Sequence, residues 1–452
     1  MIRKSKTRSS EASSEELASL FVSMLAGLLV VTCAAGERSR SPGAAPPAPA
    51  PSAAPSAAGE APSSAPLASA PNTLSDAGAD SAPAVSPPSV RLSRFFHALG
   101  PLARHEPGAR VRVLWFGDSH TAADYLTHAV RRPLQERFGN GGPGFVQLGV
   151  ERTRHALVKT TREGKWRREP ASPALGQKQL DGVFGLGGQR VIPESADARV
   201  GLELLEGAVA GDSKATFVFR ADADDRFRVS VRGTGKSESL KPKSGRAVGV
   251  LRHQDVAVGA RGALDVGVTG GAPELFGALV ESDAGGFVLD TLGINGARAQ
   301  TVLAWNEAEW QAAVRERAPA LFVFAYGTNE AASTFPTEKY EKSLSELVAR
   351  AHAAQGSADC LLVGPPDMAT LDGKSQSRAL EHDAAARRVA ERSGCHYFSA
   401  LSAMGGEGSF GRWMKEKPPL AAPDRVHLAP SGYEKIGSAL ARELLEAFDA
   451  KR

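Results

Sequence analysis

Two short blocks of the sequence hold the residue types that nucleophilic catalysis requires. Gly117-Asp-Ser-His120 contains a serine, and of the ten histidines only His427 has an aspartate, Asp424, three residues earlier. A catalytic serine needs a base that takes its proton, and the imidazole of that base needs a carboxylate to orient it. Asp and Ser are also common helix caps. The Asp-His pair supplies the missing partners, however, and predicts a triad of Ser119, His427 and Asp424.

Two further blocks offer hydrogen-bond donors. Gly293-Ile-Asn-Gly-Ala297 and Gly327-Thr-Asn-Glu330 each follow an apolar run. A glycine N–H and an asparagine amide suit the oxyanion of a tetrahedral intermediate, although each block taken singly is also an ordinary turn. All four blocks are expected at strand-to-helix junctions, on the sheet edge where open α/β proteins bind ligands. This coincidence favours an active site.

The periodicity around the blocks predicts a parallel sheet that positions them. Apolar runs begin at Val111, Phe287, Leu321, Cys360 and His396. Helical spacing is found at 126–138, 337–354, 378–392 and 432–448. Strands that alternate with helices form parallel sheets covered on both faces, so the predicted fold class is α/β. Pro133 lies within the first helical pattern and is expected to kink or divide that helix.

A different pattern interrupts this α/β rhythm. Residues 151–284 are rich in Gly and β-branched residues and lack long helical stripes. Alternation of apolar with polar residues predicts strands at 216–219, 226–232 and 264–268. We therefore expect an inserted antiparallel β-domain, a sandwich in form, between the first and second strands of the α/β domain. The insert is not needed for the chemical step, and we expect it to position a polymeric substrate.

The four blocks in this order resemble those of the SGNH hydrolases, the GDSL-type esterase superfamily. The resemblance covers about 111–144 and 287–448, and implies a flavodoxin-like, three-layer hydrolase domain. It further implies that Ser119 is the nucleophile, that Asp424 and His427 complete the triad, and that Gly296 and Asn329 form the oxyanion hole with the Ser119 N–H. No metal or organic cofactor is implied.

Two departures narrow the resemblance. His120 stands where the family usually has Leu, and Glu330 where it usually has Asp; both are candidates for contact with substrate or with the site loops. With the insert, they make the chain similar to the periplasmic peptidoglycan O-acetylesterases, whose substrate is the O-acetyl ester of the wall glycan. The same residues would serve an O-acetyltransferase acting on envelope glycans. A catalytically inactive, glycan-binding wall protein is the alternative outside enzymes.

The N-terminus has the composition of an export signal followed by a tether. Basic residues precede an apolar run over 17–31, which is the length of a signal-peptide core. Cys33 then allows lipidation as in a bacterial lipoprotein; cleavage near 34–36 and an uncleaved anchor are the alternatives. Of the 50 residues from 41 to 90, 38 are Ala, Pro or Ser, a composition typical of an extended linker. All three alternatives export the rest of the chain to the periplasm or cell envelope.

These patterns divide the 452 residues into five segments. The segments are a signal at 1–36, a disordered linker at 37–90, the first part of the hydrolase domain at 91–150, the β insert at 151–284 and the second part of the hydrolase domain at 285–452. The formal net charge of +4 is too small to indicate nucleic-acid binding. We expect an acetylated polysaccharide substrate, a membrane tether through an N-terminal lipid, and a monomer.

The cysteine content excludes a disulfide scaffold and a cysteine-rich zinc site, because the chain has three cysteines. Cys360 and Cys395 each open an apolar run. If these runs are neighbouring parallel strands, the two sulfurs meet at one end of the sheet, and an oxidising compartment permits a disulfide. The alternative is a pair of small buried hydrophobic side chains.

Overall fold

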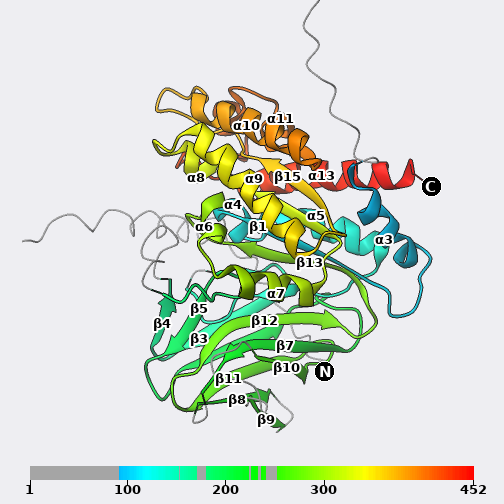
Figure 1. Cartoon of the computed structure of the whole chain (residues 1–452), viewed down its shortest axis with the longest axis vertical. Helices are drawn as coiled ribbons and strands as arrows, with labels where there is room; N and C mark the ends of the chain where they lie inside the picture. Colours follow the sequence, from blue (N-terminus) through cyan, green and yellow to red (C-terminus); the bar gives the residue numbers. More distant parts are fainter. Residues whose placement is uncertain are drawn as a thin grey trace, which may run out of the picture. The chain divides into compact units, whose positions relative to one another are not determined.

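The computed structural model describes residues 91–151, 153–170, 180–222, 225–232, 236–240 and 252–451 (Figure 1). The predicted signal, the linker and Cys33 lie outside the described residues. Within the described part of the chain, no helix is both long and apolar enough to cross a membrane.

A five-stranded parallel sheet forms the centre of the α/β part, as predicted. Its strand order is β13-β1-β14-β15-β16, and every neighbouring pair is parallel. Its strands are β1 (Arg110–Gly117), β13 (Gly286–Gly293), β14 (Leu321–Ala325), β15 (Asp359–Gly364) and β16 (His396–Ser399). All residues of β14, β15 and β16 are buried, which is typical of strands covered on both faces.

Helices cover both faces of this sheet, and β1 shows how its residues alternate between them. Val113 and Trp115 belong to one apolar core, with α3 (Ser93–Ala103), α5 (Tyr125–Phe138) and α13 (Pro430–Asp449). Leu114 and Phe116 belong to the other. That second core includes α6 (Ala299–Leu303), α7 (Glu307–Arg317), α9 (Thr337–Ala354) and α10 (Ser377–Ser393). The remaining short helices are α4 (Ser119–Ala122), α8 (Thr328–Ala331), α11 (Ala400–Met404) and α12 (Ser409–Trp413).

The helix α5 is not divided at Pro133, contrary to one of the two expected outcomes. It runs without interruption from Tyr125 to Phe138 and ends at Gly139, whose φ is 91°. Proline removes one backbone hydrogen bond from a helix interior. The apolar stripe of α5 is buried against α13 in the first core, and tertiary packing of this kind supplies most of the stability of a helix in a protein.

Between β1 and β13 the chain forms two antiparallel sheets, which confirms the predicted inserted β fold (Figure 1). One has the order β10-β7-β12-β5-β4, with β2 paired to β12, and the other has the order β3-β6-β11-β8-β9. The strands are β2 (Gly144–Val146), β3 (Val158–Glu163), β4 (Trp166–Glu169), β5 (Arg190–Pro193), β6 (Arg199–Leu204), β7 (Ser213–Arg220), β8 (Arg226–Val231), β9 (Ser237–Leu240), β10 (Arg252–Ala257), β11 (Ala263–Gly270) and β12 (Glu274–Ser282). A single apolar core contains side chains of both sheets, the arrangement of a sandwich.

Buried charges join the insert to the parallel sheet. Glu281 at the end of β12 accepts hydrogen bonds from Arg112 at 2.7 Å and from Arg317. Arg317 also donates to Asp290 of β13 at 2.6 Å. Burial disfavours the ionised form of Glu281, but its arginine partners outweigh this effect and hold its pKa well below the ordinary value. The ion pairs therefore fix the position of β12 against β1 and β13.

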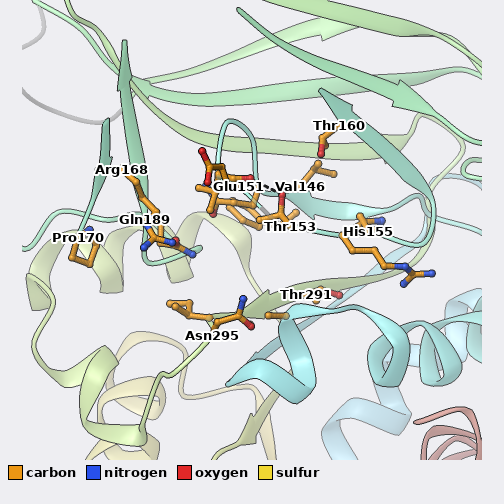
Figure 2. A pocket seen from close by; sticks show the side chains of 17 residues that line it. Val146, Glu151, Thr153, His155, Thr160, Arg168, Pro170, Gln189, Thr291 and Asn295 are labelled. Carbon is orange, nitrogen blue, oxygen red and sulfur yellow. Dashed lines mark hydrogen bonds between the residues drawn. The ribbon is translucent and has the colours of Figure 1, made fainter. Parts of the chain in front are cut away.

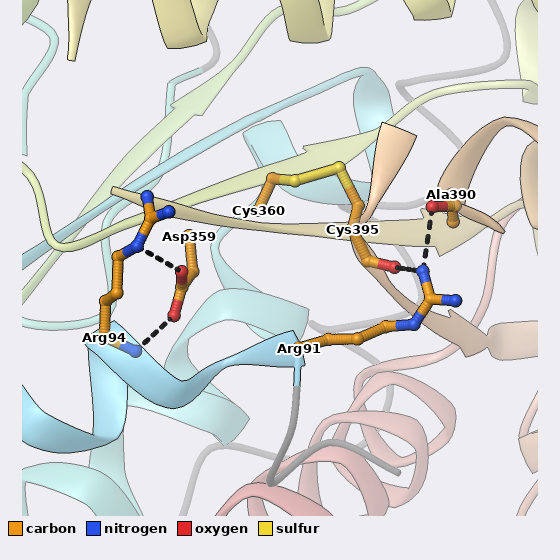
Figure 3. Close-up of a disulfide and its surroundings, with 6 residues drawn as sticks. All are labelled: Arg91, Arg94, Asp359, Cys360, Ala390 and Cys395. Atoms are coloured by element: carbon orange, nitrogen blue, oxygen red, sulfur yellow. Dashed lines mark hydrogen bonds and ion pairs between the residues drawn. A yellow bond between two sulfur atoms is a disulfide. The ribbon is translucent and has the colours of Figure 1, made fainter. Parts of the chain in front are cut away.

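Cys360 and Cys395 form a disulfide between β15 and β16, with an S–S distance of 2.00 Å and a Cα–Cα distance of 4.8 Å (Figure 3). The two strands are parallel neighbours, so the condition set from the sequence is met. Arg91 donates to the Cys395 carbonyl at 2.8 Å, and the Arg94 N–H donates to Asp359 at 2.8 Å. The start of α3 is thereby tied to the amino ends of these strands, at the sheet edge opposite the four blocks.

Candidate active site

The register of the parallel sheet aligns the carboxyl ends of β1, β13 and β14. Three of the four blocks therefore lie side by side at one edge of the sheet. Gly117, the last residue of β1, pairs with Gly293 on one side and with Ala325 on the other. A Cβ atom at residue 117 would lie 2.1 Å from the Thr121 hydroxyl oxygen and 3.0 Å from the Ala325 carbonyl oxygen. Glycine is therefore required where the chain turns from β1 into α4.

Ser119, His427 and Asp424 form a continuous hydrogen-bonded line. The distance from Ser119 Oγ to His427 Nε2 is 2.8 Å, and that from His427 Nδ1 to Asp424 Oδ2 is 2.7 Å. The other oxygen of Asp424 accepts the backbone N–H groups of Val426 and His427, at 3.0 and 2.9 Å. One loop before α13 therefore holds both the imidazole and the carboxylate that orients it.

The electrostatics of this pair match a general base. Burial alone would raise the pKa of Asp424, but the His427 side chain and two backbone N–H groups lower it to about 2. Burial lowers the pKa of His427, whereas the hydrogen bond and charge of Asp424 raise it, as does the charge of Asp118; the net shift is upward. The imidazole is thus held in one orientation beside a carboxylate that stays ionised.

A pH dependence follows from the raised pKa of His427. Only the neutral imidazole can accept the Ser119 proton, so kcat/KM for a neutral ester is expected to rise with pH and to level off above that pKa. The midpoint should lie above 6.5, the ordinary histidine value. A pH–rate profile with 4-nitrophenyl acetate measures it. Activity that stays constant well below pH 6 would exclude His427 as the base.

The two predicted donor residues lie on neighbouring loops. Gly296 is exposed and has a φ of 80°, a left-handed conformation that glycine adopts without strain. Asn329 lies in α8, partly exposed, and its Nδ2 donates to the Ala297 carbonyl at 2.9 Å. An amide nitrogen carries two hydrogens, and the second forms no hydrogen bond with the described residues. Asn329 therefore fixes the Gly296 loop and has a donor left over.

Glu330 contacts the Gly296 loop from the interior of the protein, where substrate cannot reach it. Its side chain is 1% exposed, and Oε1 accepts the Ala299 N–H at 2.9 Å, while Oε2 has no partner among the described residues. Burial raises its pKa to about 7. Arg298 is held as well, by a 3.1 Å hydrogen bond to Ser333. Of the two contacts expected for Glu330, the structure places it on the loop.

His120 is likewise buried behind the serine. Its Nδ1 lies 2.9 Å from the Tyr433 hydroxyl oxygen, and its ring centre lies 5.3 Å from that of His427. Burial lowers its pKa to about 3, which keeps the ring neutral. His120 therefore packs under the imidazole of the base and supports it.

Asp118 is the N-cap of α4, a role that its residue type allowed, and it lies close to the proposed base. It is 1% exposed, accepts the His120 N–H at 3.0 Å, and has a pKa that burial raises to about 6. Its charge contributes to the raised pKa of His427. The sequence signal was present, because Asp118 directly precedes the serine, but burial decides its role and cannot be read from the block.

No group of three or more His, Cys, Asp or Glu side chains in the described part of the chain could hold a metal ion.

Comparison with known proteins shows which family and which solved structures the chain is similar to. Residues 257–435 match the model of the GDSL-like lipase/acylhydrolase family. The match contains the second, third and fourth blocks, whereas Ser119 lies outside it. No curated relative matches the chain significantly.

Among solved structures, the chain is similar to one described as a peptidoglycan O-acetylesterase in action. The two share 25% sequence identity with a TM-score of 0.66, and the alignment covers 79% of this chain and 96% of that one. A lipase/acylhydrolase from Enterococcus faecalis is 18% identical, with a TM-score of 0.28 and coverages of 35% and 76%. A salicylyl-acyltransferase from a tetracycline biosynthetic pathway is 11% identical, with a TM-score of 0.31 and coverages of 65% and 95%.

Proposed function

We propose that this chain, in which residues 257–435 match the GDSL-like lipase/acylhydrolase family, is a serine esterase that removes O-acetyl groups from a cell-envelope polysaccharide, most specifically peptidoglycan. The observation that carries the proposal is the hydrogen-bonded line from Ser119 through His427 to Asp424. These residues lie at the carboxyl edge of the parallel sheet. The fold around them, including the insert, is similar to that of a peptidoglycan O-acetylesterase.

The reaction proceeds in two acyl transfers. Ser119 Oγ attacks the acetyl carbonyl while His427 Nε2 takes its proton, and Asp424 stabilises the imidazolium. The bond between the acyl carbon and the sugar oxygen then breaks, and His427 returns the proton to that oxygen. Water attacks the acetyl-serine with His427 again as base, and acetate leaves as Ser119 recovers its proton. Each step leaves the enzyme unchanged in charge.

The loops from β13 and β14 stabilise the negative oxygen of each tetrahedral intermediate. The proposed donors are the N–H groups of Ser119 and Gly296 and the side-chain amide of Asn329. The hydrogen bonds from Asn329 to the Ala297 carbonyl and from Ala299 to Glu330 hold the loop in place before substrate binds. Donors that need no reorganisation during the reaction stabilise the transition state most strongly.

Exposure of the base favours hydrolysis over transfer to another sugar. The side chain of His427 is 39% exposed, and that of Asp424 is 34% exposed. Solvent therefore reaches the base, which supports water as the group that attacks the acetyl-serine. The complete set of triad and donor residue types disfavours an inactive binding protein.

We further propose that the protein is exported and acts in the periplasm or cell envelope. The apolar run over 17–31 supports export, and Cys33 provides a site for a lipid tether. The disulfide between Cys360 and Cys395 supports it too, because such bonds persist in oxidising compartments.

Release of acetate from O-acetylated peptidoglycan tests the proposed function. The wild-type protein is expected to release acetate from the native polymer. It should release none from the same polymer after mild base has removed its O-acetyl groups. Hydrolysis of aryl acetates without any release from O-acetylated peptidoglycan would contradict the proposed substrate while leaving the esterase chemistry in place.

A further inference from the structure

A pocket of about 250 Å³ lies beside the Gly296 loop, between the insert and the parallel sheet (Figure 2). One wall comes from the hydrolase domain and includes Ala122, the last residue of α4, with Gly293 and Asn295 from the loop after β13. The opposite wall comes from the insert and includes Thr160 and Gln189. Asn295 directly precedes Gly296, so the pocket is continuous in sequence with the proposed oxyanion loop.

Gln189 is the least expected residue of this pocket. The residue as a whole is 7% exposed, but its amide atoms remain accessible from the pocket and form no hydrogen bond with the described residues. Its backbone is fixed, since the next residue, Arg190, forms ion pairs with Glu169 at 2.6 Å and with Asp181 at 2.8 Å. The Gln189 amide, which has no partner among the described residues, is therefore available to a ligand in the pocket.

Asn295 offers a second amide from the opposite wall. Figure 2 shows Gln189 and Asn295 on the two sides of the pocket, on the insert and on the loop after β13. Asn295 is exposed and also forms no hydrogen bond with the described residues. Two amides that face one cavity can each donate and accept, which suits a ligand rich in hydroxyl or acetamido groups.

Charged side chains also line the pocket around the two amides, among them Arg154 and Arg168. Arg154 donates to the Ala123 carbonyl at 3.0 Å and stacks on the Tyr125 ring at 3.9 Å. Glu151 pairs with Arg162 at 2.6 Å. Burial lowers the pKa of His155 to about 4, so its ring is neutral. The pocket thus presents amides and hydroxyls together with the guanidinium groups of Arg154 and Arg168, a lining that can bind a saccharide rich in hydroxyl or acetamido groups.

We propose that this pocket is a saccharide subsite, in which the amides of Gln189 and Asn295 bind the sugar unit next to the acetylated one. The inference rests on the proposed glycan substrate and adds where the polymer lies: it extends from Ser119 past the Gly296 loop and under the insert. The volume accommodates a single sugar ring with its substituents. The insert then contributes binding energy at a distance from the ester, while the α/β domain carries out the chemistry.

The binding test uses the full chain and chitotetraose, a β-1,4-linked oligomer of N-acetylglucosamine that carries no ester. Gln189→Met keeps the length and the unbranched shape of the side chain but removes the amide. Calorimetric titration is expected to show at least about a tenfold weaker Kd for this variant, the loss of one or more hydrogen bonds. Gln311→Met, on α7 outside the pocket, is the matched control and should bind as the wild type does.

Binding to Gln189→Met with unchanged Kd, or no binding of chitotetraose to the wild type, would overturn the subsite. Should Gln189→Met fail to fold, judged by its melting curve, Asn295→Ser replaces it in the same titration with the same expectation. Kinetics add a second readout. For Gln189→Met, kcat/KM on O-acetylated peptidoglycan should fall about tenfold, mainly through KM, while 4-nitrophenyl acetate hydrolysis changes less than about twofold. Equal losses on both substrates would assign Gln189 a structural role.

The subsite and the proposed function can fail separately. If the wild type releases no acetate from peptidoglycan but binds chitotetraose through Gln189, the subsite stands and the assigned substrate is wrong. If acetate is released normally and Gln189→Met changes neither binding nor KM, the esterase stands and the subsite is wrong.

Discussion

Replacing Ser119 by alanine is expected to lower the turnover of 4-nitrophenyl acetate by about 10⁴-fold or more, because the members of a catalytic triad act as a unit. The alanine variant keeps the oxyanion donors and the binding surface, so residual activity above that of water is expected. Ser119 is only partly buried and its hydroxyl contacts the His427 side chain. The melting temperature should therefore stay close to that of the wild type.

Ser409→Ala provides a control for the loss of a serine hydroxyl elsewhere. Ser409 is buried and its hydroxyl lies 3.3 Å from Asp367, away from the proposed triad. Its replacement is expected to affect stability more than turnover. A folded Ser119→Ala protein that keeps more than about a tenth of wild-type turnover would remove Ser119 from the role of nucleophile.

Replacing Asn329 by alanine is expected to lower kcat by about 10² to 10³, the usual effect of losing one oxyanion donor. KM should change little, because the donor interacts most strongly with the transition state. The variant also loses the hydrogen bond to the Ala297 carbonyl. Part of the effect could therefore come from a loosened loop, and a second variant is needed to separate the two causes.

Glu330→Met is that second variant. It removes the acceptor of the Ala299 N–H and so loosens the same loop, but it leaves the Asn329 amide in place. Its kcat is expected to fall by about tenfold or less, the effect of one hydrogen bond. If Glu330→Met and Asn329→Ala lower kcat equally, or if the Asn329 effect is confined to KM, Asn329 supports the loop and is not an oxyanion donor.

Much of the fold could be predicted because a strong pattern of apolar residues is compatible with only one type of secondary structure. The apolar runs at Leu321 and Cys360 became fully buried parallel strands, and the helix expected over 337–354 has those same ends. The β pattern in the insert predicted strands but not their order, since alternation along one strand does not specify its neighbour. The division expected at Pro133 did not occur, because local propensity was weighed without the packing of α5 against α13.

The candidate site likewise contains residues that could be predicted from the sequence and residues that could not. The proposed triad could be named because its chemistry requires these residue types in recognisable short blocks. Ser119 lies in one such block, and Asp424 and His427 lie three residues apart in another. Asp118 could be recognised as a possible helix cap, but its burial close to His427 arises only when the chain folds. Gln189 belongs to no motif. Its amide faces a cavity and has no partner among the described residues, an arrangement that arises only when distant segments fold together.

Covalent labelling tests the central claim, that Ser119 is the nucleophile of an acyl-enzyme, most directly. The wild-type protein would be treated with an ethyl phosphonate ester that reacts with activated serines, digested, and analysed by peptide mass spectrometry. The adduct is expected on Ser119, with loss of esterase activity in proportion to labelling, and His427→Ala should label far more slowly because the serine then lacks its base. An adduct on another residue, or full inactivation with Ser119 unmodified, would contradict the mechanism.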